Sequence, residues 1–346
     1  MHSKEIGIYN ILIFKHLLQV VSVIFSLALI SCGDDGVDNT ESRVAISSII
    51  FGDEKFQSCV EEIGATWTDE VSNISCFNRN ISDISGIEYF NNLTTLGLTY
   101  NNISDVSALS SLTNLTGLYL IANSISDISA LSSLTNLTEL YLTLNGITDI
   151  SPLGSLNSLI RLNLQTNSII DISPVRSLSN LTSLDFKQNN INDISPIASL
   201  PNLKYLTFDD NDISDISSLT SNANLIFLSL SNNTISDISV LTSLINMSDL
   251  SLSNNNISDL SPISSLANLT NLELSNNNIV DLSPLATPSS LRSLYLDGNS
   301  ISDISLLYSH TNLTFLYLDN NNILCADLST LVAILGDVVI QPVSCL

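Results

Sequence analysis

Basic residues and histidines are scarce in this chain. Its 346 residues include 10 lysines and arginines and 3 histidines, against 34 acidic residues. A nucleic-acid-binding surface needs a basic stripe, so nucleic acid is excluded as a partner. His2 and His16 lie near the amino terminus, which leaves only His310 in the body of the chain. There is no glycine-rich phosphate loop, no cysteine or histidine pair at zinc spacing and no nucleophile beside a base. We therefore expect no metal, no cofactor and no enzyme activity.

Long apolar runs are also lacking, except for one near the amino terminus. Lys4 and Lys15 precede the apolar segment 17–30, which only Gln19 and two serines interrupt. A membrane span needs about 20 apolar residues, so this shorter run is typical of the core of a signal peptide. We predict that residues 1–31 are a signal peptide.

The end of this run carries a single cysteine. The segment from Leu29 to Gly33 reads Leu-Ile-Ser-Cys-Gly and resembles the bacterial lipobox, in which the cysteine becomes the lipidated first residue of the mature protein. The resemblance implies a lipid anchor on Cys32 as the only membrane contact, at the outer membrane or cell surface. The following residues are acidic and nearly free of long apolar side chains, so 32–45 is predicted to be a flexible tether.

A strict repeat fills most of the chain. From Asn92 to Cys325 the sequence recurs every 22 residues without insertion or deletion, in the pattern LxxLxLxxNxI from place 2 of each copy. Places 4 to 8 alternate apolar and polar residues, which is the period of a half-buried strand. Such a period predicts a solenoid, because only stacking can bury the apolar face of each copy. The eleven copies begin at Asn92, Asn114, Asn136, Ser158, Asn180, Asn202, Asn224, Asn246, Asn268, Ser290 and Asn312.

This pattern resembles the leucine-rich repeat family, in the 22-residue class of internalins and phosphatase regulators. The resemblance implies an α/β solenoid of horseshoe shape, with a parallel sheet on the concave face and 3₁₀ or short helical turns on the convex face. Inward asparagines at place 10 are predicted to satisfy the backbone where the chain turns away from each strand. They are Asn101, Asn123, Asn145, Asn167, Asn189, Asn211, Asn233, Asn255, Asn277, Asn299 and Asn321.

A column of aspartates occupies place 14. Carboxylates at one-rung spacing repel one another unless each accepts local backbone hydrogen bonds, so we predict a ladder that caps turns. A cation-binding stripe is the alternative, although calcium prefers converging oxygens to a single file. Within the turn, Ser151 is predicted to be the N-cap, followed by Pro152 at the first helical place. The column comprises Asp83, Asp105, Asp127, Asp149, Asp171, Asp193, Asp215, Asp237, Asp259, Asp281 and Asp303.

Four cysteines remain after Cys32, one pair at each end of the repeats. Three pairings are possible in principle. Eleven rungs hold the ends about 50 Å apart, so only Cys59–Cys76 and Cys325–Cys345 are within reach. We predict an N-terminal cap with a degenerate first repeat at 46–91, repeats at 92–324 and a C-terminal cap at 325–346.

Both caps are predicted to be helical. Asp53 is expected to cap one helix and Asp327 the other, and Gly64 and Gly336 are expected to end them. The apolar faces comprise Phe56, Cys59, Val60 and Ile63 in the first helix, and Leu328, Leu331, Val332 and Leu335 in the second.

The concave face holds the residues that the repeat leaves free, at places 4, 6, 8 and 9. Tyr119 and Tyr141 share a column on adjacent rungs, so their rings are predicted to lie side by side. Exposed aromatic residues among polar ones form binding hot spots, although tyrosine also favours strands for packing alone. The candidate protein-binding residues are Tyr100, Tyr119, Ile121, Tyr141, Leu144, Arg161, Lys187, Tyr295 and Tyr317.

Two readings of the charged residues on this face stay open. Arg161 stands in the column of Glu139, and Lys187 faces Asp209, so these residues form ion pairs on the scaffold or contact a ligand. A calcium site at Asp209, Asp210 and Asp212 is a further alternative.

The pattern favours a monomeric envelope lipoprotein that binds another protein, on a host or a neighbouring cell, as an adhesin. Residues 32–346 carry 8 basic and 33 acidic side chains, which favours basic partners. The alternatives are a structural envelope lipoprotein without a specific ligand and a regulatory subunit that docks on an enzyme.

Overall fold

A computed structural model describes residues 43–340 and Cys345. The predicted signal peptide, the lipidation site Cys32 and all but the last three residues of the predicted tether lie outside the described residues. None of the described helices is long and apolar enough to cross a membrane.

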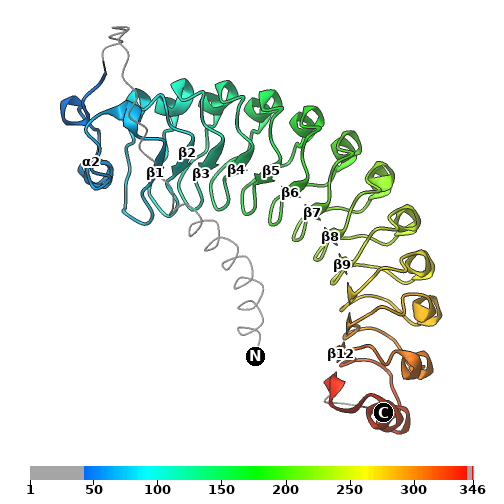
Figure 1. The fold of residues 1–346 in the computed structure, drawn as a ribbon. Helices are drawn as coiled ribbons and strands as arrows, with labels where there is room; N and C mark the ends of the chain where they lie inside the picture. The colour runs from blue at the N-terminus through cyan, green and yellow to red at the C-terminus, as the bar shows by residue number, and fades with distance from the viewer. Residues whose placement is uncertain (1–42, 341–344, 346) are drawn as a thin grey trace, which may run out of the picture. The chain divides into compact units, whose positions relative to one another are not determined.

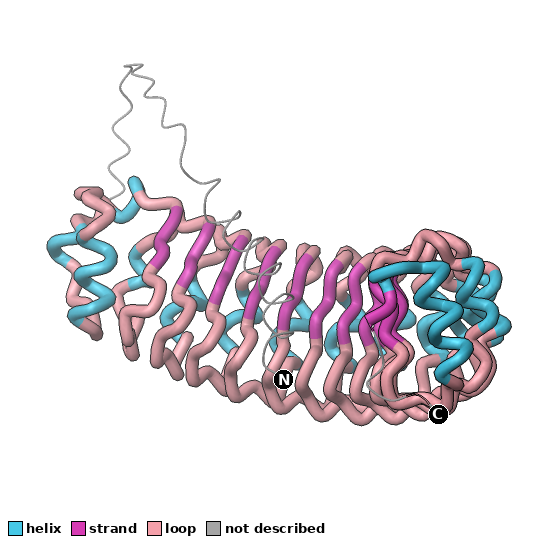
Figure 2. The backbone as a smooth tube through the Cα atoms, turned by 90° about the horizontal axis from the view of Figure 1, so that it is seen from below, coloured by secondary structure: helices cyan, strands magenta, loops and turns pink. Residues whose placement is uncertain are grey.

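One parallel sheet runs through the described repeats. Each strand occupies places 4 to 6 of its copy and pairs with the next in a register of 22 residues, so that Leu96 lies beside Leu118. The strands line the concave side of the arc in Figure 1 and all appear on one face in Figure 2. The described part of the sheet comprises β1 (Asn73–Ser75), β2 (Thr95–Gly97), β3 (Gly117–Tyr119), β4 (Glu139–Tyr141), β5 (Arg161–Asn163), β6 (Ser183–Asp185), β7 (Tyr205–Thr207), β8 (Phe227–Ser229), β9 (Asp249–Ser251), β10 (Asn271–Glu273), β11 (Ser293–Tyr295), β12 (Phe315–Tyr317) and β13 (Val339–Ile340).

Short 3₁₀ helices form the convex side. In the repeats these are η4 (Ser107–Ser111), η5 (Ser129–Ser133), η6 (Ser151–Ser155), η7 (Ser173–Ser177), η8 (Ser195–Ser199), η9 (Ser217–Ser221), η10 (Ser239–Ser243), η11 (Ser261–Ser265), η12 (Ser283–Ala286) and η13 (Ser305–Ser309). Four more lie near the ends, namely η1 (Ile46–Ser48), η2 (Thr68–Glu70), η3 (Ile87–Tyr89) and η14 (Gly336–Val338). The fold predicted from the repeat is confirmed.

The aspartate column orders these turns. Asp149 Oδ1 accepts a hydrogen bond from the backbone N–H of Ser151 at 2.8 Å, and Oδ2 accepts one from its hydroxyl at 2.9 Å. The prediction that Ser151 is the N-cap is therefore wrong. Ile150 is the N-cap and Ser151 is the first residue of the turn, because the acceptor side chain lies two residues earlier in the chain. The capping role predicted for the aspartates is confirmed.

The core is a stack of identical apolar layers joined by the asparagine column. Asn123 Nδ2 donates to the carbonyls of Leu98 and Leu120 at 3.0 and 3.1 Å, and its Oδ1 accepts from the backbone N–H of Ile103. One amide thus satisfies three backbone groups on two rungs, as predicted. The layer of β3 is at most 1% exposed and comprises Leu115, Leu118, Leu120, Ile125, Ile128, Leu131 and Leu134.

Helix α2 (Glu54–Glu61) closes the N-terminal end. The Asp53 side chain caps it by accepting from the backbone N–H groups of Lys55 and Phe56, as predicted. Phe56, Cys59 and Val60 are buried, whereas Ile63 lies beyond the helix and is 42% exposed, so its predicted place in the apolar face is wrong. Cys59 and Cys76 form a disulfide that joins this helix to the first rung.

Helix α3 (Cys325–Leu335) closes the other end, and Gly336 follows it with a φ of 68°. Its N-cap is Leu324, so Asp327 lies within the first turn and does not cap it as predicted. The helix begins two residues earlier than expected because Cys325 is its first residue. Leu328 and Leu331 are buried against the last rung, and Cys325 forms a disulfide with Cys345.

Candidate binding face

The nine residues predicted to bind protein all lie on the concave strands or just after them. They fall into two groups rather than one. The first surrounds the tyrosines of β3 and β4, and the second contains the tyrosines of β11 and β12. Seven strands separate Tyr141 from Tyr295, which is about 34 Å at the usual strand spacing. One small ligand group cannot contact both.

The N-terminal patch consists of Phe77, Tyr100, Tyr119, Ile121, Tyr141 and Leu144. The rings of Tyr119 and Tyr141 stack with centroids 5.2 Å apart, which confirms the predicted adjacency. Phe77 meets Tyr100 edge to face at 5.4 Å. Phe77, Tyr100 and Leu144 are 56%, 44% and 46% exposed. The patch therefore offers a continuous apolar surface in which ring contacts hold four of the side chains.

Sequence reasoning missed Phe77. It belongs to the degenerate first repeat, which we assigned to the cap. The 22-residue count nevertheless puts Phe77 in the column of Ile121, two rungs before it. That alignment was the available signal.

A hydrogen-bonded ion pair supports the tyrosine stack. The Tyr119 hydroxyl donates to Glu139 Oε2 at 2.7 Å, and Arg161 pairs with the other oxygen of the same carboxylate. Burial and the bond to Glu139 raise the pKa of Tyr119 well above its ordinary value, so Tyr119 remains a donor at physiological pH. The predicted Glu139–Arg161 pair is confirmed, and it neutralises the carboxylate beside the stack.

Place 9 is held in the left-handed region of backbone conformation throughout the repeats. From Tyr100 to Asn320 its φ lies between 53° and 69° in every rung. A residue other than glycine, asparagine or aspartate loses about 1–3 kcal/mol in such a conformation. The C-terminal rungs carry suitable residues there, namely Asp210, Asn232, Asn254, Asn276, Gly298 and Asn320.

The N-terminal rungs carry unsuitable residues at the same place. These are Tyr100, Ala122, Leu144, Thr166 and Gln188, and their φ values run from 54° to 59°. Backbone strain of this kind gathers at binding sites, because side chains needed for contact are kept despite the conformation. Two of the five, Tyr100 and Leu144, belong to the N-terminal patch.

Polar ladders occupy the middle of the concave face. Lys187 Nζ lies 3.9 Å from Asp209 Oδ2 and 3.8 Å from Asp210 Oδ2, so the predicted pair is present. Asp209 also accepts from the Ser229 hydroxyl at 2.5 Å. Burial raises the pKa of Asp185 to about 6. Among the residues described, the structure brings no three histidine, cysteine, aspartate or glutamate side chains together in a cluster that could hold a metal ion.

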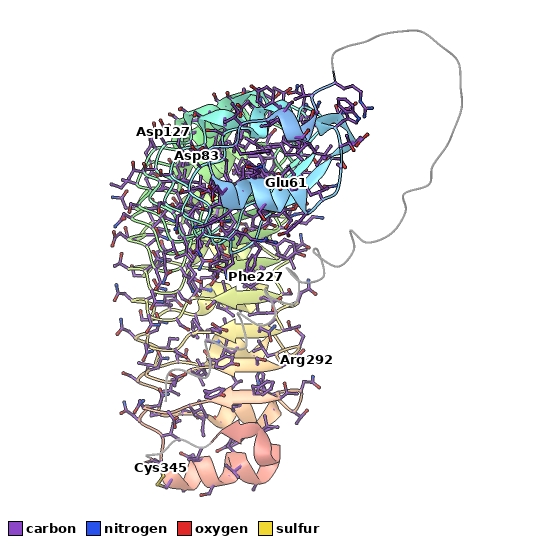
Figure 3. The ribbon with its side chains drawn as sticks, turned by 90° about the vertical axis from the view of Figure 1, so that its left-hand side faces the viewer. Glu61, Asp83, Asp127, Phe227, Arg292 and Cys345 are labelled. Carbon is purple, nitrogen blue, oxygen red and sulfur yellow. A yellow bond between two sulfur atoms is a disulfide. The ribbon has the colours of Figure 1, made fainter. Side chains whose placement is uncertain are left out.

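Two aromatic residues in this middle region were also missed. Tyr205 is 50% exposed on β7, and Phe227 lies beside it in register on β8 (Figure 3). Both stand at place 4, where the other rungs carry mostly polar residues, so only a column-by-column comparison would have revealed them.

The C-terminal patch consists of Glu273, Tyr295, Asp297, Phe315, Tyr317 and Asp319. Tyr295 and Tyr317 stack with centroids 4.8 Å apart, and Phe315 is 50% exposed. The Ser251 hydroxyl donates to Glu273 at 2.6 Å, and the Ser275 hydroxyl donates to Asp297 at 2.5 Å. These donors are neutral, so they orient the carboxylates without cancelling their charge.

Comparison with known proteins agrees with this architecture. A family model described as leucine rich repeats (2 copies) matches residues 91–133, 113–153, 135–177, 179–221, 223–265, 245–287 and 289–332. The chain belongs to the leucine-rich repeat family. Its repeats are of the internalin type, since an internalin from Listeria monocytogenes is 35% identical over 84% of this chain and 88% of that one, with a TM-score of 0.80.

Two further solved structures are similar in fold. A leucine-rich repeat protein of Leptospira interrogans is 27% identical, covering 69% of this chain and 63% of that one, with a TM-score of 0.66. A plant peptide hormone receptor in complex with RGF2 is 22% identical, covering 72% of this chain and 51% of that one, with a TM-score of 0.58. No curated protein sequence matches the chain.

Proposed function

We propose that this chain is a bacterial envelope lipoprotein, anchored through Cys32, that binds another protein through the N-terminal patch and acts as an adhesin. In this proposal residues 1–31 are removed and 32–45 form the tether. The observation that carries it is the strained row at place 9. Tyr100 and Leu144 are large and exposed, and both hold a backbone conformation that asparagine adopts at lower cost.

The patch has the features of a binding hot spot. Stacking and the hydroxyl bond to Glu139 restrict the rings of Tyr119 and Tyr141 before any ligand arrives. A restricted side chain loses little further entropy on binding. The Glu139–Arg161 pair leaves the stack without an uncompensated charge, so apolar contacts dominate. Repeat proteins use extended concave surfaces of this kind to bind partners, and the plant receptor above was solved with a bound partner.

Paired substitutions test this binding mode. Full-length protein carrying Tyr119→Ala and Tyr141→Ala is compared with protein carrying Tyr205→Ala and Phe227→Ala, which removes two rings from the same face outside both patches. Binding to intact host or neighbouring cells is measured with labelled protein. The first variant should bind at least about tenfold more weakly, as truncation of central hot spots does. Equal binding by both variants would contradict the proposal.

The anchor is tested separately. Protease shaving of intact cells should release the repeats if they face outward, and Cys32→Ser should move the protein from the membrane fraction to the soluble fraction. Retention of Cys32→Ser in the membrane fraction would rule out lipidation at this residue without bearing on the binding patch.

A further inference from the structure

A second aromatic pair lies in the same column as the first, near the other end of the concave face. Tyr295 and Tyr317 occupy place 6 of β11 and β12, and their rings stack more closely than those of the first pair. Phe315, at place 4 of β12, is 50% exposed and adds a third ring to this part of the sheet. Three aromatic side chains thus lie within two adjacent rungs.

Carboxylates border these rings on two sides. Glu273 is the register partner of Tyr295 on the preceding strand, about 4.8 Å away along the sheet. Asp297 and Asp319 each follow a tyrosine by two residues on the same strand, on the same face and about 6.7 Å on. The aromatic rings therefore share one face with three acidic groups.

The surrounding chain supplies little positive charge. Residues 211–340 contain twelve acidic residues and a single basic one, Arg292. In Figure 3, Arg292 extends from the edge of the solenoid opposite Asp127, on the side where the chain enters the strands. Asp297 and Asp319 follow the strands instead. The first patch differs in this respect, because its Glu139 is paired with Arg161.

We propose that the C-terminal patch binds an arginine side chain from a basic segment of a protein partner. A guanidinium group is attracted to the faces of tyrosine and phenylalanine rings and forms paired hydrogen bonds with carboxylates. A calcium ion would gain nothing from the rings and needs several converging oxygens. A lysine ammonium lacks the planar group that stacks on an aromatic ring. This inference does not depend on the N-terminal patch, which lies several strands away.

The test uses the full chain and two short peptides in a glycine–serine background, one with two arginines and one with two lysines in the same positions. Binding is followed by fluorescence polarisation at low salt. The arginine peptide should bind about threefold or more tightly than the lysine peptide, because stacking adds to the charge attraction. No measurable binding of the arginine peptide, or equal binding of both, would overturn the proposal.

Two variants locate the site. Asp297→Asn with Asp319→Asn keeps the side-chain shapes and should weaken binding of the arginine peptide about tenfold. Tyr295→Ala with Tyr317→Ala should weaken it about threefold.

A matched control removes two charges elsewhere, with Glu61→Gln and Asp212→Asn, and should leave binding within about twofold. An equal loss in the control would mean attraction to overall charge and would overturn the site. If the tyrosine variant unfolds, as judged by its melting temperature, Tyr295→Leu with Tyr317→Leu replaces it, because leucine fills the column without an aromatic face.

Discussion

The two tyrosine pairs differ in their surroundings and hardly at all in their geometry. Tyr119–Tyr141 and Tyr295–Tyr317 occupy the same column, and both stack with interplanar angles below 20°. The repeat sets ring geometry because it places each ring one strand from the next. The neighbours at places 4, 8 and 9 vary, so they decide whether a pair is apolar and neutral or acidic.

The two halves also differ in backbone strain. At place 9 the C-terminal rungs carry asparagine, aspartate or glycine, whereas the N-terminal rungs carry residues that disfavour the left-handed conformation. One scaffold therefore stabilises one half and retains strained side chains in the other. We infer that the two halves serve different contacts.

The largest expected effect concerns the rung beneath the C-terminal pair. Pro288 has no backbone N–H, so it cannot donate to the Leu285 carbonyl as Leu112 does to Leu109 in a regular rung. His310 Nε2, 3.0 Å from that oxygen, replaces the missing donor. His310→Leu should lower the free energy of unfolding by about 2 kcal/mol, since it leaves the buried carbonyl unsatisfied.

Adding Pro288→Leu to this variant restores the regular donor. The double variant should recover most of the lost stability in urea unfolding. If the effects of the two substitutions simply add, the compensation is wrong.

A reciprocal exchange at place 9 tests the difference in strain. Leu144→Asn should raise the free energy of unfolding by about 1 to 2 kcal/mol, and Asn232→Leu should lower it by a similar amount. Urea unfolding of the two single variants measures both. The same sign for the two changes would show that side-chain packing, rather than backbone conformation, decides stability at this place.

The smallest expected effect concerns Asp185, between the two patches. Burial raises its folded pKa to about 6, above the ordinary value near 4 of the unfolded chain. The ionised carboxylate therefore destabilises the fold above pH 6, and this penalty disappears as the pH falls from 6 towards 4. Relative to the native chain, Asp185→Asn should gain about 1 kcal/mol between pH 4.5 and pH 7.5.

Asp215 provides the control of opposite sign. The backbone N–H of Ser217 holds the pKa of Asp215 below its usual range, so its ionised form stabilises the fold. Asp215→Asn should therefore lose stability relative to the native chain as the pH rises. Parallel pH profiles for the two variants would contradict the assignment of burial as the cause at Asp185.

Much of the scaffold was predictable because its signals recur in every copy. The asparagine column, the aspartate ladder and the cysteine pairing each followed from spacing and from the distance between the ends. The capping details were less accessible. Ser151 and Asp327 carry the right chemistry for N-caps, but the turn and the helix begin at residues that sequence preference alone does not select.

The binding face was predictable in its location and only partly in its composition. Places 4, 6, 8 and 9 identified the concave columns, and the cross-strand ion pairs followed from charge alignment. The bond from Tyr119 to Glu139 was not foreseen, because it joins places 6 and 4 of adjacent rungs. Phe77 was missed because the repeat around it is degenerate.

The 22-residue period alone determined the fold, since each side chain that builds the core or turns the chain makes its contacts within its own copy or one copy away. The tertiary structure decided the left-handed conformation of place 9, the neutral setting of one tyrosine pair and the acidic setting of the other. These properties depend on how side chains and backbone on adjacent strands meet across the sheet. The period sets the distance between those strands but does not select the partners that form.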